Sequence, residues 1–137
     1  MREAKILLVE DNEGDIILTK EALKEAKIKN EICVAMDGQQ ALDILNGPEL
    51  PDMILLDINL PKVDGLEVLS TIKKDDRLKK IPVIMLSTSS AESDISTSYN
   101  NHANCFITKP VDLLHFMEVV KTIEDFWISI VKLPQKQ

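Results

Sequence analysis

Hydrophobic and polar positions form two alternating patterns along this chain. In the first, short runs of consecutive apolar residues end in charged or hydroxyl-bearing residues, as expected for strands buried on both faces of a parallel sheet. In the second, apolar residues recur every three or four positions, which predicts helices with one buried side. The runs predict strands at residues 5–9, 31–36, 53–57, 81–86 and 105–108.

A helical pattern follows each predicted strand. Asn12 or Asp15 is a candidate cap for the first helix, and Asp37 and Asp112 are candidates for the second and the last. The segment 91–101 is a weak helix, because its Ser, Thr and Asn residues are poor helix formers. The alternation predicts an α/β fold with a doubly wound, five-stranded parallel sheet. The helices are predicted at residues 15–27, 39–46, around 66–74, 91–101, and from 112 to about 131.

The composition narrows the class of protein. A length of 137 residues and an apolar content of 45% suit one domain with a full core, so we expect residues 1–137 to form a single domain. The net charge of −7 argues against nucleic acid as a direct partner. No apolar run is long enough to cross a membrane, and the N-terminus lacks a signal-peptide pattern, so we expect a cytoplasmic protein.

The two cysteines, Cys33 and Cys105, lie in predicted strands. If these strands form opposite edges of the sheet, they are about 19 Å apart, far beyond the reach of a disulfide. We therefore predict that both cysteines are buried and pack as small hydrophobic residues in a reducing compartment.

Reactive side chains stand at the carboxyl ends of four predicted strands. In open α/β sheets, ligands bind at this edge. If the first and third strands are neighbours, these side chains converge on one shallow pocket. The set consists of Glu10, Asp11, Asp57, Ser87 and Lys109.

The ordered set resembles the signature of response regulator receiver domains of the CheY-like family. That signature is an acidic pair, a phosphoacceptor aspartate, a hydroxyl residue, an aromatic residue and a Lys-Pro pair, and the resemblance extends over nearly the whole chain. It implies a flavodoxin-like (βα)5 fold with strand order 2-1-3-4-5, in a receiver domain without an output domain. The matching residues are Glu10-Asp11, Asp57, Ser87, Phe106 and Lys109-Pro110.

The resemblance also implies a Mg²⁺ site, because clustered carboxylates would otherwise repel one another and reject a phosphoryl group. Asp11 and Asp57 would bind Mg²⁺ directly, together with the backbone carbonyl of Asn59. Glu10 would act through a metal-bound water. Asp57 would then be the nucleophile that accepts a phosphoryl group from a histidine kinase.

The remaining signature residues would stabilise the phosphoryl group and change the protein surface in response to it. Lys109 would neutralise its charge, and Ser87 and the Thr88 backbone N–H would contact its oxygens. Movement of Ser87 would let Phe106 turn inward and change the surface made by the fourth helix, the fifth strand and the fifth helix. Two plain alternatives exist, since Ser87 also fits a helix cap and Phe106 also fits a core position.

The last predicted helix has a wide apolar face. Its arc covers roughly 200°, against about 100° for a helix buried on one side. The surplus favours a homodimer through this helix, and a crowded monomer core is the alternative. Residues 126–134 also resemble the C-terminus of stand-alone receivers paired with cyanobacterial-phytochrome-type histidine kinases. The predicted dimer interface consists of Val119, Phe126 and Trp127.

Two other functions compete with the receiver. A phosphatase of the haloacid-dehalogenase type also uses an aspartate nucleophile and Mg²⁺, but it usually places a second Asp two residues later, where this chain has Asn59. A receiver-like interaction module without phosphorylation is the second alternative, and the acidic pair and Lys109 count against it. We therefore expect a phosphoacceptor signalling domain rather than an enzyme.

Overall fold

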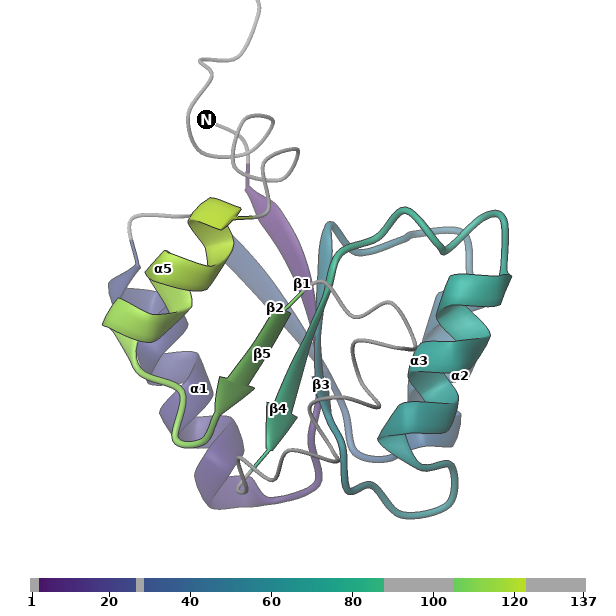
Figure 1. The fold of residues 1–137 in the computed structure, drawn as a ribbon, viewed down its shortest axis with the longest axis horizontal. Helices are drawn as coiled ribbons and strands as arrows, with labels where there is room; N and C mark the ends of the chain where they lie inside the picture. Colours follow the sequence, from purple (N-terminus) through teal and green to yellow (C-terminus); the bar gives the residue numbers. More distant parts are fainter. Residues whose placement is uncertain (1–2, 27–28, 88–104, 123–137) are drawn as a thin grey trace, which may run out of the picture.

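The computed structural model describes residues 3–26, 29–87 and 105–122. Within these residues, five parallel strands form one sheet in the order β2-β1-β3-β4-β5, which confirms the expected order (Figure 1). The strands are β1 (Ala4–Val9), β2 (Asn30–Ala35), β3 (Met53–Asp57), β4 (Val83–Ser87) and β5 (Cys105–Thr108). The helices are α1 (Glu13–Glu25), α2 (Gly38–Leu45), α3 (Gly65–Lys74) and α5 (Leu113–Thr122).

Three of the predicted helices lie wholly or partly outside the described residues. The undescribed positions are all of the predicted helix 91–101, residue 27 at the end of the predicted helix 15–27, and the part of the last predicted helix beyond residue 122. Among the helices that are described, none has the length and apolar character needed to cross a membrane.

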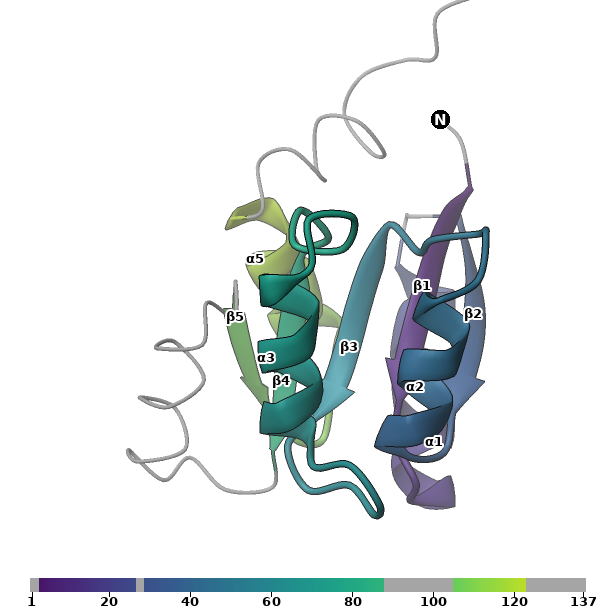
Figure 2. The ribbon, with the colours of Figure 1, turned by 90° about the vertical axis from the view of Figure 1, so that its right-hand side faces the viewer.

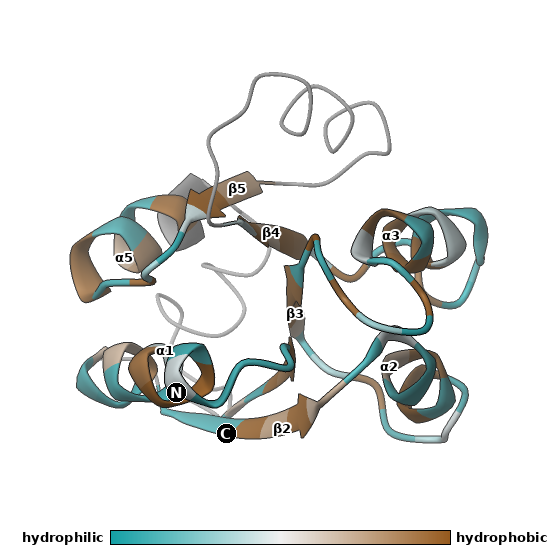
Figure 3. Cartoon of the chain, turned by 90° about the horizontal axis from the view of Figure 1, so that it is seen from below, coloured by the Kyte–Doolittle hydropathy of each residue, from teal (hydrophilic) through white to brown (hydrophobic). Residues whose placement is uncertain are grey.

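Helices cover the sheet on both faces. Helices α1 and α5 lie on one face, and α2 and α3 lie on the other (Figures 2 and 3). Side chains of β1 point alternately to the two faces of the sheet. Ile6 and Leu8 pack in the core beneath α1 and α5. Leu7 and Val9 pack in the core beneath α2 and α3. The two-sided burial predicted from the apolar runs is therefore confirmed for β1, and it also holds for β3 and β4.

Local hydrogen bonds move the start of two elements away from the predicted positions. Helix α1 begins two residues earlier than predicted, because Asn12 rather than Asp15 is its cap: Asn12 Oδ1 accepts a hydrogen bond from the Asp15 N–H at 2.9 Å. Strand β4 begins at Val83, because the Ile81 N–H donates to a carbonyl of the preceding turn. The predicted bounds of β3 and β5 are confirmed.

The prediction that both cysteines are buried is wrong. Cys33 is exposed and Cys105 is partly exposed, although they do lie on opposite edge strands, as predicted. Within the described part of the chain, strand β2 has a neighbour on one side only, and its burial alternates along the strand. An apolar run in an edge strand therefore does not guarantee burial on both faces.

Asp37→Ala is expected to destabilise the protein at neutral pH, by an amount that shrinks in acid. Asp37 Oδ1 accepts the Gln40 N–H at 2.8 Å at the start of α2, and this hydrogen bond holds the pKa of Asp37 below its usual value. A lowered native pKa means that the ionised carboxylate stabilises the fold fully above the pKa of the unfolded carboxyl. This stabilisation is lost as the pH falls through the native pKa.

Urea unfolding midpoints of the wild type and Asp37→Ala, measured from neutral pH into acid, check this expectation. Asp37→Asn is the matched control, because it keeps a capping acceptor that does not ionise. A difference between wild type and Asp37→Ala that stays constant with pH would contradict a role for the Asp37 charge.

Candidate functional site

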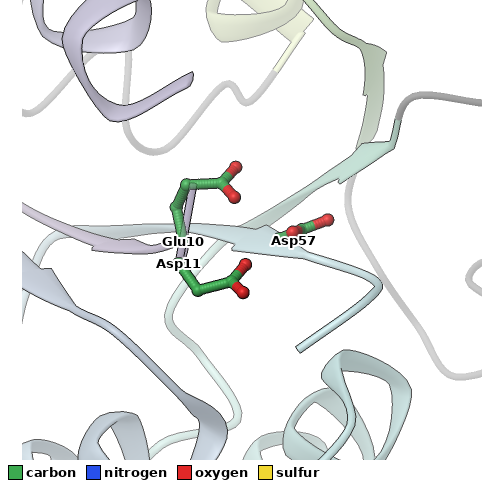
Figure 4. A group of neighbouring side chains, drawn as sticks. All are labelled: Glu10, Asp11 and Asp57. Carbon is green, nitrogen blue, oxygen red and sulfur yellow. The ribbon is translucent and has the colours of Figure 1, made fainter. Parts of the chain in front are cut away.

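Three carboxylates gather where β1 and β3 end. Glu10 and Asp11 directly follow β1, and Asp57 is the last residue of β3 (Figure 4). One carboxylate oxygen from each residue lies within 4.8 Å of the other two. Glu10 is fully buried and Asp57 is 4% exposed, whereas Asp11 is exposed. We refer to Glu10, Asp11 and Asp57 as the acidic trio.

The register of the sheet explains why two of these carboxylates are neighbours. Val9 of β1 lies opposite Leu56 of β3, so Glu10 and Asp57 are the next pair along the two strands. The Glu10 N–H donates to the last carbonyl of β2 at 3.0 Å, which extends the β1–β2 ladder by one residue. The Asn59 N–H donates to Asp57 Oδ1 at 3.2 Å. Backbone pairing thus holds Glu10 and Asp57 side by side.

Lys109 brings a positive charge to the same place. Its side chain is only 7% exposed, and Nζ lies 2.5 Å from Glu10 Oε1, 3.1 Å from Asp15 Oδ2 and 3.3 Å from Asp57 Oδ2. The Lys109 N–H donates to the last carbonyl of β4 at 2.7 Å, and the peptide bond to Pro110 is cis. One ammonium group thus contacts carboxylates from three segments of the chain.

Burial and ion pairing oppose each other in this group. Burial raises the pKa of Glu10, and the hydrogen bond from Lys109 offsets part of that rise. Burial by itself would lower the pKa of Lys109, but its hydrogen bonds to Glu10 and Asp15 and the charge of Asp57 outweigh burial and raise the pKa above its usual value. Lys109 is therefore a protonated ammonium group at neutral pH.

Negative charge exceeds positive charge in the described part of the site. The acidic trio and Asp15 supply four carboxylates, and Lys109 supplies one ammonium group. A hard divalent cation would balance the excess, because such ions prefer several oxygen ligands at close spacing. The three oxygens of the acidic trio therefore fit the predicted Mg²⁺, and Asp11 is the most accessible of the three residues.

Two residues of the predicted switch lie on β4 and β5. Ser87 is fully buried and ends β4, one position beyond the pairing of Leu86 with Asp57. Phe106 is partly buried in β5 and packs against the core on the α2 and α3 side. Thr88 lies outside the described residues, so the structure does not place the third predicted phosphoryl contact.

Of the predicted dimer interface, Val119 alone lies among the described residues. It is on α5, where it is partly buried against the core on the α1 side. Phe126 and Trp127 lie outside the described residues. The homodimer therefore stays a prediction.

Asp15 is a site residue that the sequence did not reveal. Its place at the start of a predicted helix indicated a capping role, which Asn12 fills instead. The structure places Asp15 Oδ2 3.1 Å from Lys109 Nζ, across 94 positions of sequence. One signal in the sequence was that Asp15 follows the acidic pair Glu10-Asp11 by about one helical turn, in a segment that resembles the same stretch of phytochrome-type stand-alone receivers.

Comparison with known proteins places this geometry in a family. Residues 6–121 match the model of the response regulator receiver domain. Response regulator Rcp1 of Synechocystis sp. is 45% identical over 136 residues, which cover 94% of this chain and 92% of the relative. A crystal structure of the Mn²⁺-bound form of Rcp1 is similar with a TM-score of 0.74 and 44% identity, over 96% of this chain and 99% of that chain.

Two further solved structures are similar over almost the whole chain. The bacteriophytochrome response regulator AtBRR has a TM-score of 0.82 and 41% identity, with 100% of both chains covered. The phosphorylated cyanobacterial phytochrome response regulator RcpA has a TM-score of 0.78 and 47% identity, over 98% of this chain and 100% of that chain. The similarity therefore includes every element that carries the acidic trio and Lys109.

Proposed function

This chain belongs to the response regulator receiver domain family, and from that premise we propose that its Asp57 accepts a phosphoryl group from a histidine kinase. Receiver domains are signalling domains that work with histidine kinases in two-component systems, and they bind Mg²⁺ or Mn²⁺ in an acidic pocket. The observation that carries the proposal is the acidic trio with a buried lysine 3.3 Å from the Asp57 carboxylate. The family match favours the receiver over the phosphatase alternative.

The proposed transfer is a nucleophilic displacement at phosphorus. An Asp57 carboxylate oxygen attacks the phosphorus of a phosphohistidine, and the bond from phosphorus to the imidazole nitrogen breaks with its electron pair left on the imidazole. The carboxylate is held in one orientation, because Oδ1 accepts the Asn59 N–H and Oδ2 pairs with Lys109. Mg²⁺, when held by Asp11, Asp57 and the Asn59 carbonyl, supplies positive charge to the transferring oxygens. Glu10 would take part through a metal-bound water.

Lys109 is the residue that stabilises the product charge. Its protonated Nζ lies close enough to Asp57 Oδ2 to donate to a phosphoryl oxygen once the new bond has formed. Burial increases the effect of this charge, because a water-poor surrounding screens it weakly. Ser87 and the Thr88 backbone N–H are proposed to contact the other phosphoryl oxygens, and the position of Ser87 at the end of β4, beside β3, supports this role.

We further propose that the phosphoryl group changes the surface formed by the segment 91–101, β5 and α5. Ser87 would move toward the phosphoryl group, and Phe106 would turn into the space it leaves. Phe106 lies on the edge strand β5 and is partly exposed, so its ring is not locked into the core on all sides.

The proposed partner is a phytochrome-type histidine kinase, and the proposed compartment is the cytoplasm. Solved structures of phytochrome and bacteriophytochrome response regulators are similar to this chain, which supports a sensor of that type. A single receiver domain over residues 1–137, and assembly through Val119, Phe126 and Trp127, are further proposals.

Incubation with Mg²⁺ and acetyl phosphate is expected to add one phosphoryl group, about 80 Da, to the wild-type protein. Asp57→Asn is expected to abolish this adduct, because the amide is not a nucleophile of comparable strength. Intact-protein mass spectrometry measures both results, and chelation of Mg²⁺ is expected to suppress the wild-type adduct.

Asp76→Asn is the matched control, because the Asp76 side chain is 95% exposed and pairs only with Lys79 among the described residues. It should form the adduct as the wild type does. No wild-type adduct with acetyl phosphate or with a phosphorylated kinase domain would overturn the proposed function in favour of the interaction module. Rapid hydrolysis of diverse phosphate esters would instead support the phosphatase alternative.

A further inference from the structure

Asp15 is not part of the acidic trio, but it contacts Lys109, the lysine that also pairs with Glu10 and Asp57. Its Oδ2 accepts a hydrogen bond from Lys109 Nζ at 3.1 Å, and its side chain is 26% exposed. Building on the phosphoryl transfer to Asp57 proposed above, we propose that Asp15 is a positioning residue. It anchors the Lys109 ammonium so that the ammonium faces the phosphoryl group on Asp57.

The geometry around Lys109 matches the donor count of an ammonium group. A lysine ammonium has three N–H donors, and Lys109 Nζ lies near one carboxylate oxygen from each of three residues. Glu10 and Asp57 belong to the acidic trio, whose charge a bound cation would share. Asp15 is the remaining carboxylate. It lies outside the acidic trio, so its negative charge would not be shared with the cation and can pair with Lys109.

Asp15 is itself held in place by the start of α1. The Asp15 N–H donates to Asn12 Oδ1 at 2.9 Å, and the Asn12 N–H donates to Glu10 Oε2 at 3.2 Å. The other carboxylate oxygen of Glu10, Oε1, lies 2.5 Å from Lys109 Nζ. The four residues therefore form a closed ring of polar contacts, in which the helix cap orients Asp15 toward the lysine.

Anchoring matters because a lysine side chain is long and flexible. Each rotatable bond that must be ordered during the reaction raises its barrier, whereas a donor that is already in place needs no reorganisation. When Asp57 becomes phosphorylated, the donor that faced its carboxylate can turn to a phosphoryl oxygen. The contact with Asp15 keeps the rest of the ammonium group where it was.

The negative charge of Asp15 also has a second, opposite effect on the reaction. It repels an anionic phosphoryl donor, so a purely repulsive Asp15 would make Asp15→Asn faster than the wild type. A positioning Asp15 makes Asp15→Asn slower. The sign of the change therefore separates the two roles.

Asp15→Asn is expected to slow formation of the acetyl phosphate adduct at saturating Mg²⁺ by about five-fold, well below the loss expected from removing a charge-stabilising donor itself. Asp15→Glu, which keeps the charge, is expected to recover most of the wild-type rate. Glu13→Gln is the matched control, because it removes an exposed carboxylate from the same first turn of α1 and has the same effect on the helix dipole.

A double-mutant cycle tests whether Asp15 acts through Lys109. In a Lys109→Met background, Asp15→Asn should cause no further slowing, because the group that it positions is gone. A second readout does not depend on phosphorylation: the side-chain ammonium NMR signal of Lys109 should shift in Asp15→Asn and stay unchanged in Glu13→Gln.

Each contrary outcome has a distinct meaning. An absent adduct in the wild type overturns the phosphorylation of Asp57, whereas an unchanged Lys109 ammonium signal in Asp15→Asn overturns the positioning role by itself. An Asp15→Asn rate equal to or above that of the wild type, or equal slowing with and without Lys109, also overturns the positioning role.

Discussion

Lys109→Met is expected to slow phosphorylation of Asp57 by about 100- to 1,000-fold, which is the usual loss when one preorganised donor to the transferring charge is removed. Lys109 Nζ lies 3.3 Å from Asp57 Oδ2, and its side chain is 7% exposed, so little water can replace it. Methionine keeps an unbranched apolar side chain and removes the charge. The rate of adduct growth at saturating Mg²⁺ measures the effect, and chemical denaturation verifies that the variant is folded.

Lys79→Met is the matched control for the loss of a paired lysine. Lys79 Nζ lies 2.9 Å from Asp76 Oδ1, and both side chains are largely exposed. Its removal should leave the rate of phosphorylation unchanged. A folded Lys109→Met protein that is phosphorylated at the wild-type rate would show that the ammonium does not stabilise the transferring group.

Gly65→Ala is expected to lower the free energy of unfolding by about 3 kcal/mol, at the upper end of the range for overpacking. Gly65 begins α3, and a Cβ there would overlap the Asp57 carbonyl oxygen and lie 2.7 Å from the Ile58 carbonyl oxygen. Both obstacles are backbone atoms at the end of β3, so the helix must move away from the strand that carries Asp57. Phosphorylation of Asp57 is therefore expected to weaken as well.

The thermal midpoint measures this loss, and a fall of about 10 °C corresponds to it for a domain of this size. Gly14→Ala is the matched control, because a Cβ there would meet only Asn12 Oδ1, at 3.2 Å, which is the end of a side chain. That variant should stay close to the wild type, since alanine favours the helix that Gly14 occupies. Equal stability of the two variants would mean that α3 can shift freely at Gly65.

The close approach of α3 to the end of β3 at Gly65 could not be predicted from the sequence. The pair Asp64-Gly65 indicates a turn before a helix, and Asp64 does cap α3 by accepting the Leu66 N–H at 3.2 Å. None of the described glycines has a positive φ, so backbone conformation is not what requires glycine at this position. The requirement comes from the distance between α3 and β3, which no local pattern encodes.

The periodicity of apolar residues predicted the type and approximate position of the described elements, because side-chain direction follows the repeat of a helix or strand. It placed β3 at its observed bounds and put Glu10, Asp11 and Asp57 at strand ends. The order of the strands came from the family resemblance, since the periodicity of each element is the same for any order.

Tertiary structure alone decided the contacts between segments that are far apart in the chain. Only the packing of α1 against the loop after β5 places Asp15 beside Lys109, and only the edge position of β2 exposes Cys33. Sequence patterns report whether a residue faces the core, but not which neighbour it meets there. That neighbour depends on how separate elements pack together, and here such packing sets the charge around Asp57.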